Sequence, residues 1–260
     1  MKMKRMICLL LAVAMILPAG CSKKKATETP KATEESAPTF KAENYTKSGK
    51  TDNAVEWGFD EETGELAIGG EGDLIVIPEP DEDTEKYPNG KLPWSDYEIK
   101  KITVFSGVTS ICGEAFMGID TVEVVDLPAT VTDIGDRAFA SCAALKEINV
   151  SKDNPNYMSA GGVLFTKDAK VLVQYPVGKG QTTYEIPEGV ETIGTMAFAN
   201  CGDTLNTVTI PSSVTWIGEG AFLFCRVLES VAYGGTEAEW KSVKVEKDND
   251  LLKFATFYFK

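Results

Sequence analysis

The feature that most constrains the fold is a short phrase that recurs along the chain. It reads VTDIGDRAFASC at 131–142, VETIGTMAFANC at 190–201 and VTWIGEGAFLFC at 214–225, with a weaker copy, VTSICGEAFMGI, at 108–119. The aligned phenylalanines lie 23, 59 and 24 residues apart: Phe116, Phe139, Phe198 and Phe222. A period near 23 is typical of a solenoid, in which each turn buries its apolar residues against the next.

A second phrase, with the pattern L-x-x-L-x-L, precedes each copy and alternates apolar and polar positions as a strand does. It occurs at 99–104, 122–127, 145–150, 181–186, 205–210 and 228–233. Strands that recur with a return path between them pair in parallel, and about a dozen residues suffice for the crossover. The return path reads as an extended piece from Val131 to Ile134, a glycine, and a short helical turn carrying Ala138 and Phe139. We therefore predict an α/β solenoid with a parallel β-sheet ladder, short helical turns and stacked Ile, Ala and Phe columns.

The repeat VTDIGDRAFASCAALKEINV resembles the BspA-like family of bacterial surface leucine-rich repeat proteins. The resemblance extends from about Trp57 to the C-terminus. WGFDEETGELAIGGEGDL, with LPW at 92–94, resembles the family's N-terminal β cap, and VAYGGTEAEWKSVKV at 231–245 resembles its C-terminal cap. The first copy is atypical, with Cys112 and Ile119 where the others have glycine and cysteine. The resemblance implies a leucine-rich repeat fold and a role in surface binding.

The 59-residue interval exceeds the period by 36 residues, which indicates an insertion. Within it, GVLFT and KVLVQY read as a β-hairpin between turn-rich segments. The predicted organisation is a lipoprotein signal peptide, a flexible tether, an N-terminal β cap, leucine-rich repeats with the hairpin insertion, and a C-terminal cap. Their boundaries are 1–20, 21–50, 51–98, 99–234 with the insertion at about 151–180, and 235–260.

The N-terminus predicts export. A basic MKMKR segment precedes an apolar stretch and the sequence PAGC, and the apolar stretch is too short for a spanning helix. The end resembles a bacterial lipobox, which implies acylation of Cys21, although Pro18 stands where that motif usually has leucine. Plain secretion is the alternative. Residues 22–50 are rich in Lys, Glu, Thr, Ala and Pro, a composition that favours a tether over a packed domain. We expect an extracellular protein anchored to the bacterial membrane by lipid.

Composition excludes several functions. The sequence has no histidine, which removes Ser-His-Asp and Cys-His catalysis and the commonest zinc ligand. Cleavage before Cys21 would remove three basic and no acidic residues, leaving 23 basic and 39 acidic residues, a balance of −16. Such acidity argues against nucleic-acid binding and against charge-driven adhesion to anionic lipid, so we expect membrane contact only through the lipid anchor. We predict no catalytic residues, no metal site and no cofactor.

Three cysteines share one repeat position: Cys142, Cys201 and Cys225. Equivalent residues of adjacent turns lie about 5 Å apart, a separation that permits a Cys201–Cys225 disulfide. Side chains in a ladder point the same way, however, so a buried free cysteine that fills apolar space is the favoured interpretation.

The third and fifth positions of each strand phrase point away from the core and should form two continuous columns. These are Lys101, Val124, Glu147, Thr183, Thr207 and Ser230, and Thr103, Asp126, Asn149, Glu185, Thr209 and Ala232. Solenoids commonly bind along such a face. The candidate ligand-binding residues are Asp126, Glu147, Asn149, Glu185, Thr207 and Thr209, with a solvated polar surface as the alternative.

Trp216 is the best single surface candidate. Its equivalents in the other copies are Ser110, Asp133 and Thr192, all polar, so we expect Trp216 to be at least partly exposed. An exposed indole can anchor a protein or stack on a sugar ring. The alternative is packing against a neighbouring loop or the insertion. The predicted function is adhesin-like binding of a protein or glycan on host or neighbouring cells, with an envelope scaffold that docks another envelope protein as the alternative.

Overall fold

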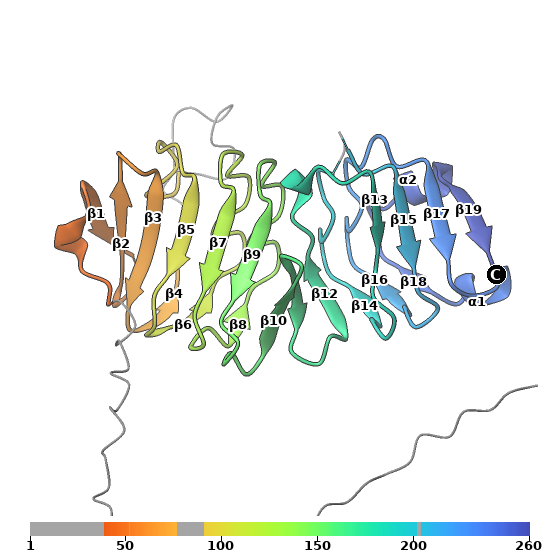
Figure 1. The fold of residues 1–260 in the computed structure, drawn as a ribbon, viewed down its shortest axis with the longest axis horizontal. Helices are drawn as coiled ribbons and strands as arrows, with labels where there is room; N and C mark the ends of the chain where they lie inside the picture. The colour runs from red at the N-terminus through yellow and green to blue at the C-terminus, as the bar shows by residue number, and fades with distance from the viewer. Residues whose placement is uncertain (1–38, 52, 77–90, 202–203) are drawn as a thin grey trace, which may run out of the picture. The chain divides into compact units, whose positions relative to one another are not determined.

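The computed structural model describes residues 39–51, 53–76, 91–201 and 204–260. Each turn of the coil contributes one strand to a main ladder and one to a return ladder, and successive turns pair in parallel (Figure 1). The fold is therefore a solenoid, as the period predicted, and it has the leucine-rich repeat architecture that the family resemblance implied.

The main ladder consists of two sheets. The first is built from β1 (Lys47–Lys50), β2 (Val55–Asp60), β3 (Glu65–Gly70), β5 (Lys101–Val104), β7 (Val124–Leu127) and β9 (Glu147–Val150), and the second from β13 (Thr183–Glu185), β15 (Thr207–Ile210), β17 (Ser230–Tyr233) and β19 (Thr256–Phe259). The return ladder is divided too. It comprises β4 (Gly72–Leu74), β6 (Val108–Ile111) and β8 (Asp133–Ile134), then β10 (Tyr157–Ala160), β11 (Val163–Thr166), β12 (Val171–Gln174), β14 (Thr192–Ile193), β16 (Trp216–Ile217) and β18 (Lys244–Val245).

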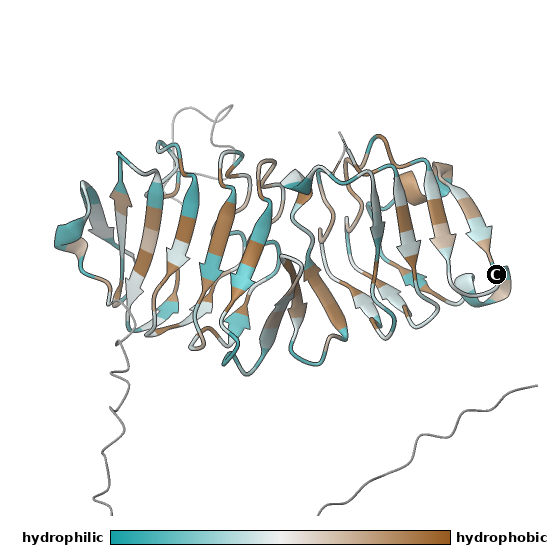
Figure 2. Ribbon diagram, in the orientation of Figure 1, coloured by the Kyte–Doolittle hydropathy of each residue, from teal (hydrophilic) through white to brown (hydrophobic). Residues whose placement is uncertain are grey.

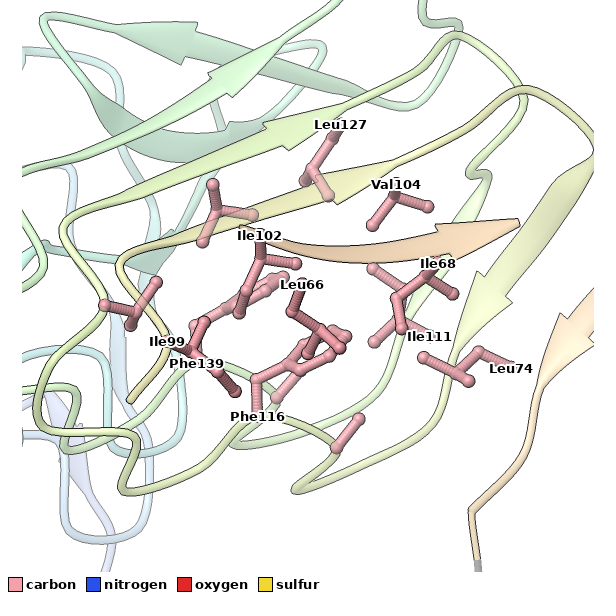
Figure 3. Close-up of a cluster of buried hydrophobic side chains, with 14 of the residues drawn as sticks. Leu66, Ile68, Leu74, Ile99, Ile102, Val104, Ile111, Phe116, Leu127 and Phe139 are labelled. Carbon is pink, nitrogen blue, oxygen red and sulfur yellow. The ribbon is translucent and has the colours of Figure 1, made fainter. Parts of the chain in front are cut away.

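The core is a stack of equivalent residues. Ile111 pairs with Ile134, and Ile193 with Ile217, in the register that the repeat predicts. Aromatic rings stack in two series, Trp94–Phe116–Phe139 with centroids 5.5 and 5.7 Å apart, and Tyr175–Phe198–Phe222 with centroids 4.9 and 5.0 Å apart. Figure 3 shows the Phe116 and Phe139 rings among side chains of the neighbouring strands, and Figure 2 shows hydrophobic bands recurring from strand to strand. Each ring stabilises the fold by about 1.5–3 kcal/mol through burial, which no single turn could provide alone.

The segment after each return strand is a pair of turns and not a helix. In the second copy Ala138 donates to Gly135 O and Ala140 to Arg137 O, while Arg137 and Ser141 have φ values of 63° and 59°. Left-handed residues interrupt a helix after every few residues. The expected helical turn at Ala138 and Phe139 is thus replaced by these hydrogen-bonded turns. The helices among the described residues are only three or four residues long: η1 (Ala42–Asn44), η2 (Val177–Lys179), α1 (Glu237–Trp240) and α2 (Leu251–Phe254).

The insertion divides both ladders. The predicted hairpin is present as β11 and β12, and β10 adds a third antiparallel strand that the sequence did not suggest. β12 then pairs in parallel with β14 and so begins the second part of the return ladder. Two hydrophobic clusters follow this division, one drawn from residues 55–164 and the other from residues 163–252.

Both caps are built around local signals. The predicted capping box is present, because Glu239 N donates to Thr236 Oγ1 at 3.3 Å and Thr236 N donates to the Glu239 carboxylate at 2.7 Å. The N-terminal cap begins before residue 51, since β1 already pairs with β2. Phe40 and Tyr45 stack on one another at 5.5 Å and lie against Gly69 and Gly58. Residues 39–50, assigned to the tether from composition, therefore belong to the cap.

Within the described ranges no helix is both long and apolar enough to cross a membrane.

Candidate functional site

The N-terminal half of the main ladder brings three of the predicted site residues together. Asp126 pairs in register with Asn149, and Glu147 lies two residues before Asn149 on β9. Asn149 Nδ2 donates to Asp126 Oδ1 at 3.0 Å and to Glu147 Oε1 at 3.4 Å. Lys101 Nζ lies 2.7 Å from Asp126 Oδ2, and this hydrogen bond raises the pKa of Lys101. The acidic patch is thus already compensated by a lysine and an amide on an open face.

The two polar columns do not run the length of the molecule, which corrects the prediction. Thr183 pairs with Thr207, and Glu185 with Thr209, in the second main sheet, whereas Glu147 belongs to the first. The reason is the insertion, because Ile148 N donates to Gly162 O and β9 lies beside β10 and β11. The predicted binding face is therefore two separate patches, and Glu185 does not join Asp126 and Glu147.

Trp216 lies on the return ladder, apart from both patches. Its backbone pairs with Thr192 on one side and Lys244 on the other. The indole is half-buried, and its Nε1 donates to Glu246 Oε1 at 3.1 Å. Lys244 also contacts this carboxylate. The hydrogen bond from Lys244, and to a smaller extent the one from Trp216, lower the pKa of Glu246. A charged carboxylate therefore holds one edge of the indole in place.

A pocket of about 270 Å³ opens where the return ladder is divided, between the turn that follows β8 on one side and β12 with the turn that follows β14 on the other. Trp216 lines it together with Tyr157 of the insertion. Ile134 N donates to the Tyr157 hydroxyl oxygen at 3.0 Å, and burial raises the pKa of Tyr157. We call this hollow the junction pocket. Its lining is part apolar and part polar: Ile134, Gly135, Asp136, Arg137, Ala138, Phe139, Tyr157, Thr166, Val171, Val173, Gln174, Thr192, Gly194, Thr195 and Trp216.

Gln174 is a pocket residue that the sequence analysis missed. Gln174 and Tyr175 occupy the positions that alanine and phenylalanine hold in the regular turns. The evidence is a shared hydrogen bond to the next turn: Tyr175 N donates to Ala197 O, just as Phe116 N donates to Ala138 O. The signal was available, since Gln174 and Tyr175 lie 23 residues before Ala197 and Phe198. This extra turn was missed because it lies inside the insertion and does not carry the motif of the four aligned copies.

Cys201 and Cys225 form a disulfide, with their Cα atoms 4.8 Å apart. The favoured expectation of free thiols at these two positions was therefore wrong. Adjacent turns bring the two backbones to a bridging distance, which outweighs the parallel direction of ladder side chains. Cys142 is free and buried, and burial raises its pKa to about 12. Nowhere in the described part of the chain do three or more His, Cys, Asp or Glu side chains gather in a way that could hold a metal ion.

A second hollow, of about 520 Å³, lies at the C-terminal end of the coil, where α2 meets the segment after β18. Exposed aromatic side chains lie in the same region, with Phe254 81 % and Tyr258 60 % exposed. This hollow is distinct from the junction pocket, and its lining mixes charged and apolar side chains. Cys21, the predicted lipidation site, lies outside the described residues.

Stacked turns of about 23 residues with parallel strands define a leucine-rich repeat protein. The chain belongs to the BspA type leucine rich repeat family, whose model matches six copies over residues 94–165 and 178–242, more than half of the sequence.

Solved structures of other leucine-rich repeat proteins resemble this chain at low identity. A leucine-rich repeat protein from Eubacterium ventriosum is 20 % identical over 72 % of each chain, with a TM-score of 0.31. The pneumococcal vaccine antigen PcpA is 16 % identical over 70 % of this chain and 69 % of its own, with a TM-score of 0.35. A leucine rich cell surface protein from Faecalibacterium prausnitzii is 15 % identical over 75 % of this chain and 97 % of its own, with a TM-score of 0.34. A comparison with curated proteins finds no match.

Proposed function

We propose that this protein is a lipid-anchored, cell-surface binding protein that recognises a protein or glycan on host or neighbouring cells. The observation that carries the proposal is a repeat surface with separate polar patches and an aromatic-lined junction pocket, all on open faces of the coil. Solenoids use such extended faces for recognition. Membership of the BspA type family supports a surface role.

Catalysis is not part of the proposal. The candidate carboxylates Asp126 and Glu147 share Asn149 as a hydrogen-bond donor on an open sheet face. A catalytic acid needs a site that excludes water and shifts its pKa. We therefore propose a binding protein without a cofactor.

Display on the cell surface is tested by treating intact cells with protease. We expect the domain to be shaved from whole cells and to bind a glycan or matrix-protein array when purified. A Cys21→Ala variant should move from the membrane to the medium, because acyl chains are needed for stable retention. Resistance to shaving, or a Cys21→Ala protein that stays on the membrane, would contradict the surface display and the anchor respectively.

A second candidate function is an envelope scaffold that docks another envelope protein. The exposed aromatic side chains at the C-terminal end, Phe254 and Tyr258, favour this alternative, because exposed aromatic side chains are enriched at protein interfaces. Co-purification of the full chain with a membrane partner, together with resistance to shaving, would support the scaffold over the adhesin.

A further inference from the structure

Three buried amide side chains mark the places where the regular repeat is interrupted: Asn154, Gln174 and Asn249. Both ends of the Asn154 amide are hydrogen-bonded, since its Nδ2 donates to Pro128 O and Val131 O and its Oδ1 accepts from two backbone N–H groups. Asn249 is also used at both ends, because its Nδ2 donates to Gly218 O at 2.8 Å and its Oδ1 accepts from Phe222 N at 3.0 Å. These two amides replace the backbone partners that a further turn would supply.

Gln174 differs from the other two. It is 4 % exposed, and its Nε2 donates to Tyr175 O at 3.1 Å and to Ala197 O at 3.0 Å. Its Oε1 accepts no hydrogen bond from any residue that the structure describes, and it is not among the atoms sealed from solvent. Both amide hydrogens are committed to the main chain, so the oxygen is the polar atom that Gln174 can still offer to the junction pocket that it lines. A nearly buried acceptor without a partner is unfavourable unless water or a ligand supplies a donor.

Comparison with the other turns shows that Gln174 is unusual at its repeat position. The equivalent residues of the regular turns are alanines, which need no partner: Ala115, Ala138, Ala197 and Ala221. Gln174 therefore places a polar group in an otherwise apolar column, at a turn that borders the junction pocket. In the same lining, Trp216 supplies an aromatic group and Tyr157 a hydroxyl.

We propose that the junction pocket binds one neutral hexose unit of a glycan. In this arrangement a sugar hydroxyl donates to Gln174 Oε1, and the C–H face of the ring packs on the indole of Trp216. Amphipathic aromatic side chains suit a ligand that is apolar on one face and polar at its rim. A volume of about 270 Å³ lies at the lower end of ligand pockets and fits one small ring better than a drug-sized molecule. The inference rests on the proposed surface-binding function and names its ligand.

Charge favours a neutral ligand. The pocket lining contains one carboxylate, Asp136, and one guanidinium, Arg137, whose Nε lies 3.2 Å from Glu114 Oε1. An anionic sugar would meet the carboxylate, and a lysine or arginine side chain of a protein partner would meet the guanidinium. The remaining polar lining consists of hydroxyl and amide groups, which can exchange hydrogen bonds with sugar hydroxyls: Tyr157, Thr166, Gln174, Thr192 and Thr195.

The test measures binding of methyl glycosides of glucose, galactose, mannose and N-acetylglucosamine by saturation-transfer NMR. The protein is the full chain carrying Cys21→Ala, which removes the proposed acylation site. We expect at least one glycoside to bind, and Trp216→Thr to raise its Kd about tenfold. Threonine is the residue that β14 already carries at this position, at Thr192. Gln174→Ala, which restores the residue of the regular turns, should weaken binding by a similar factor.

Phe224→Asn is the control, because it removes an aromatic side chain that is exposed and does not line the pocket. We expect it to leave the Kd unchanged. Thermal unfolding of each variant distinguishes loss of the binding site from loss of the fold. If Gln174→Ala is unstable, the conclusion is drawn from Trp216→Thr alone. The subsite is overturned if no glycoside binds at millimolar concentration, or if Trp216→Thr folds and binds like the parent. A chain that binds a matrix protein but no glycoside would overturn the subsite and leave the proposed surface function standing.

Discussion

At the scale of single residues, Phe224 occupies a backbone conformation that its equivalents fill with smaller side chains. Its φ is +58° and its side chain is 49 % exposed, whereas the same turn position holds Gly118, Ser141 and Asn200. A bulky residue in the left-handed region costs about 1–2 kcal/mol, and asparagine tolerates that region better. We expect Phe224→Asn to raise the free energy of unfolding by about 1 kcal/mol, measured by urea denaturation.

Tyr258→Asn provides the control for this substitution. Tyr258 is an exposed aromatic residue in β19, where the backbone is extended, so asparagine relieves no strain there and should not stabilise the protein. The Phe224 prediction fails if Phe224→Asn is less stable than the parent. In that case the packing of Arg226 over the Phe224 ring, 5.8 Å from its centroid, would outweigh the backbone cost.

Cys142 provides a pH-dependent test. Burial raises its pKa to about 12 from an ordinary value near 9, so the folded state keeps the thiol protonated while the unfolded chain ionises. The stability that this thiol contributes is complete below about pH 9 and is lost as the pH rises toward 12. The difference in free energy of unfolding between the parent and Cys142→Ala should therefore shrink from pH 8 to pH 10.5, by up to about 2 kcal/mol. A difference that stays constant in urea titrations at these two pH values would contradict the assignment.

At the scale of the element, the Cys201–Cys225 disulfide links two adjacent turns across a separation of 24 residues. A loop of this size is expected to contribute about 3 kcal/mol by restricting the unfolded chain. Replacing both cysteines with alanine should therefore lower the free energy of unfolding by about that amount, and peptide mapping without reductant should recover the linked pair. Cys142→Ala is the control, because it removes a cysteine at the same repeat position that forms no bridge. Equal losses in the two proteins would show that packing, and not the bridge, is responsible.

The sequence predicted the strands well because period-two alternation is a direct record of which side chains face the core. It predicted the insertion's hairpin for the same reason, and the capping box at Thr236 from local chemistry. It did not predict the turns around Arg137 and Ser141, since left-handed residues other than glycine leave little trace in composition. The junction pocket was also missed, because it depends on how the insertion rejoins the ladder at β12, a tertiary outcome that no local pattern records.

At the scale of the whole molecule, the insertion divides the solenoid into two stacks of side chains. The series Trp94–Phe116–Phe139 lies in one hydrophobic cluster, and Tyr175–Phe198–Phe222 lies in the other. They are joined by hydrogen bonds such as Gly178 N to Leu145 O and by a small buried cluster of Ala140, Met196 and Ala199. Because solenoid stability is a sum of terms between neighbouring turns, the two halves should respond separately to a core mutation.

The prediction concerns hydrogen exchange in Phe198→Ala and Phe116→Ala, two equivalent substitutions on either side of the insertion. Each removes a fully buried ring and should cost about 3–5 kcal/mol. Exchange should quicken in β13, β15 and β17 for Phe198→Ala while β5 and β7 keep their protection, and the reverse should hold for Phe116→Ala. Equal loss of protection in both halves would show that the turns around the junction pocket couple the stacks into one cooperative unit. Independent halves would instead allow the junction pocket to change its width without unfolding either stack, because its two walls then belong to separate units.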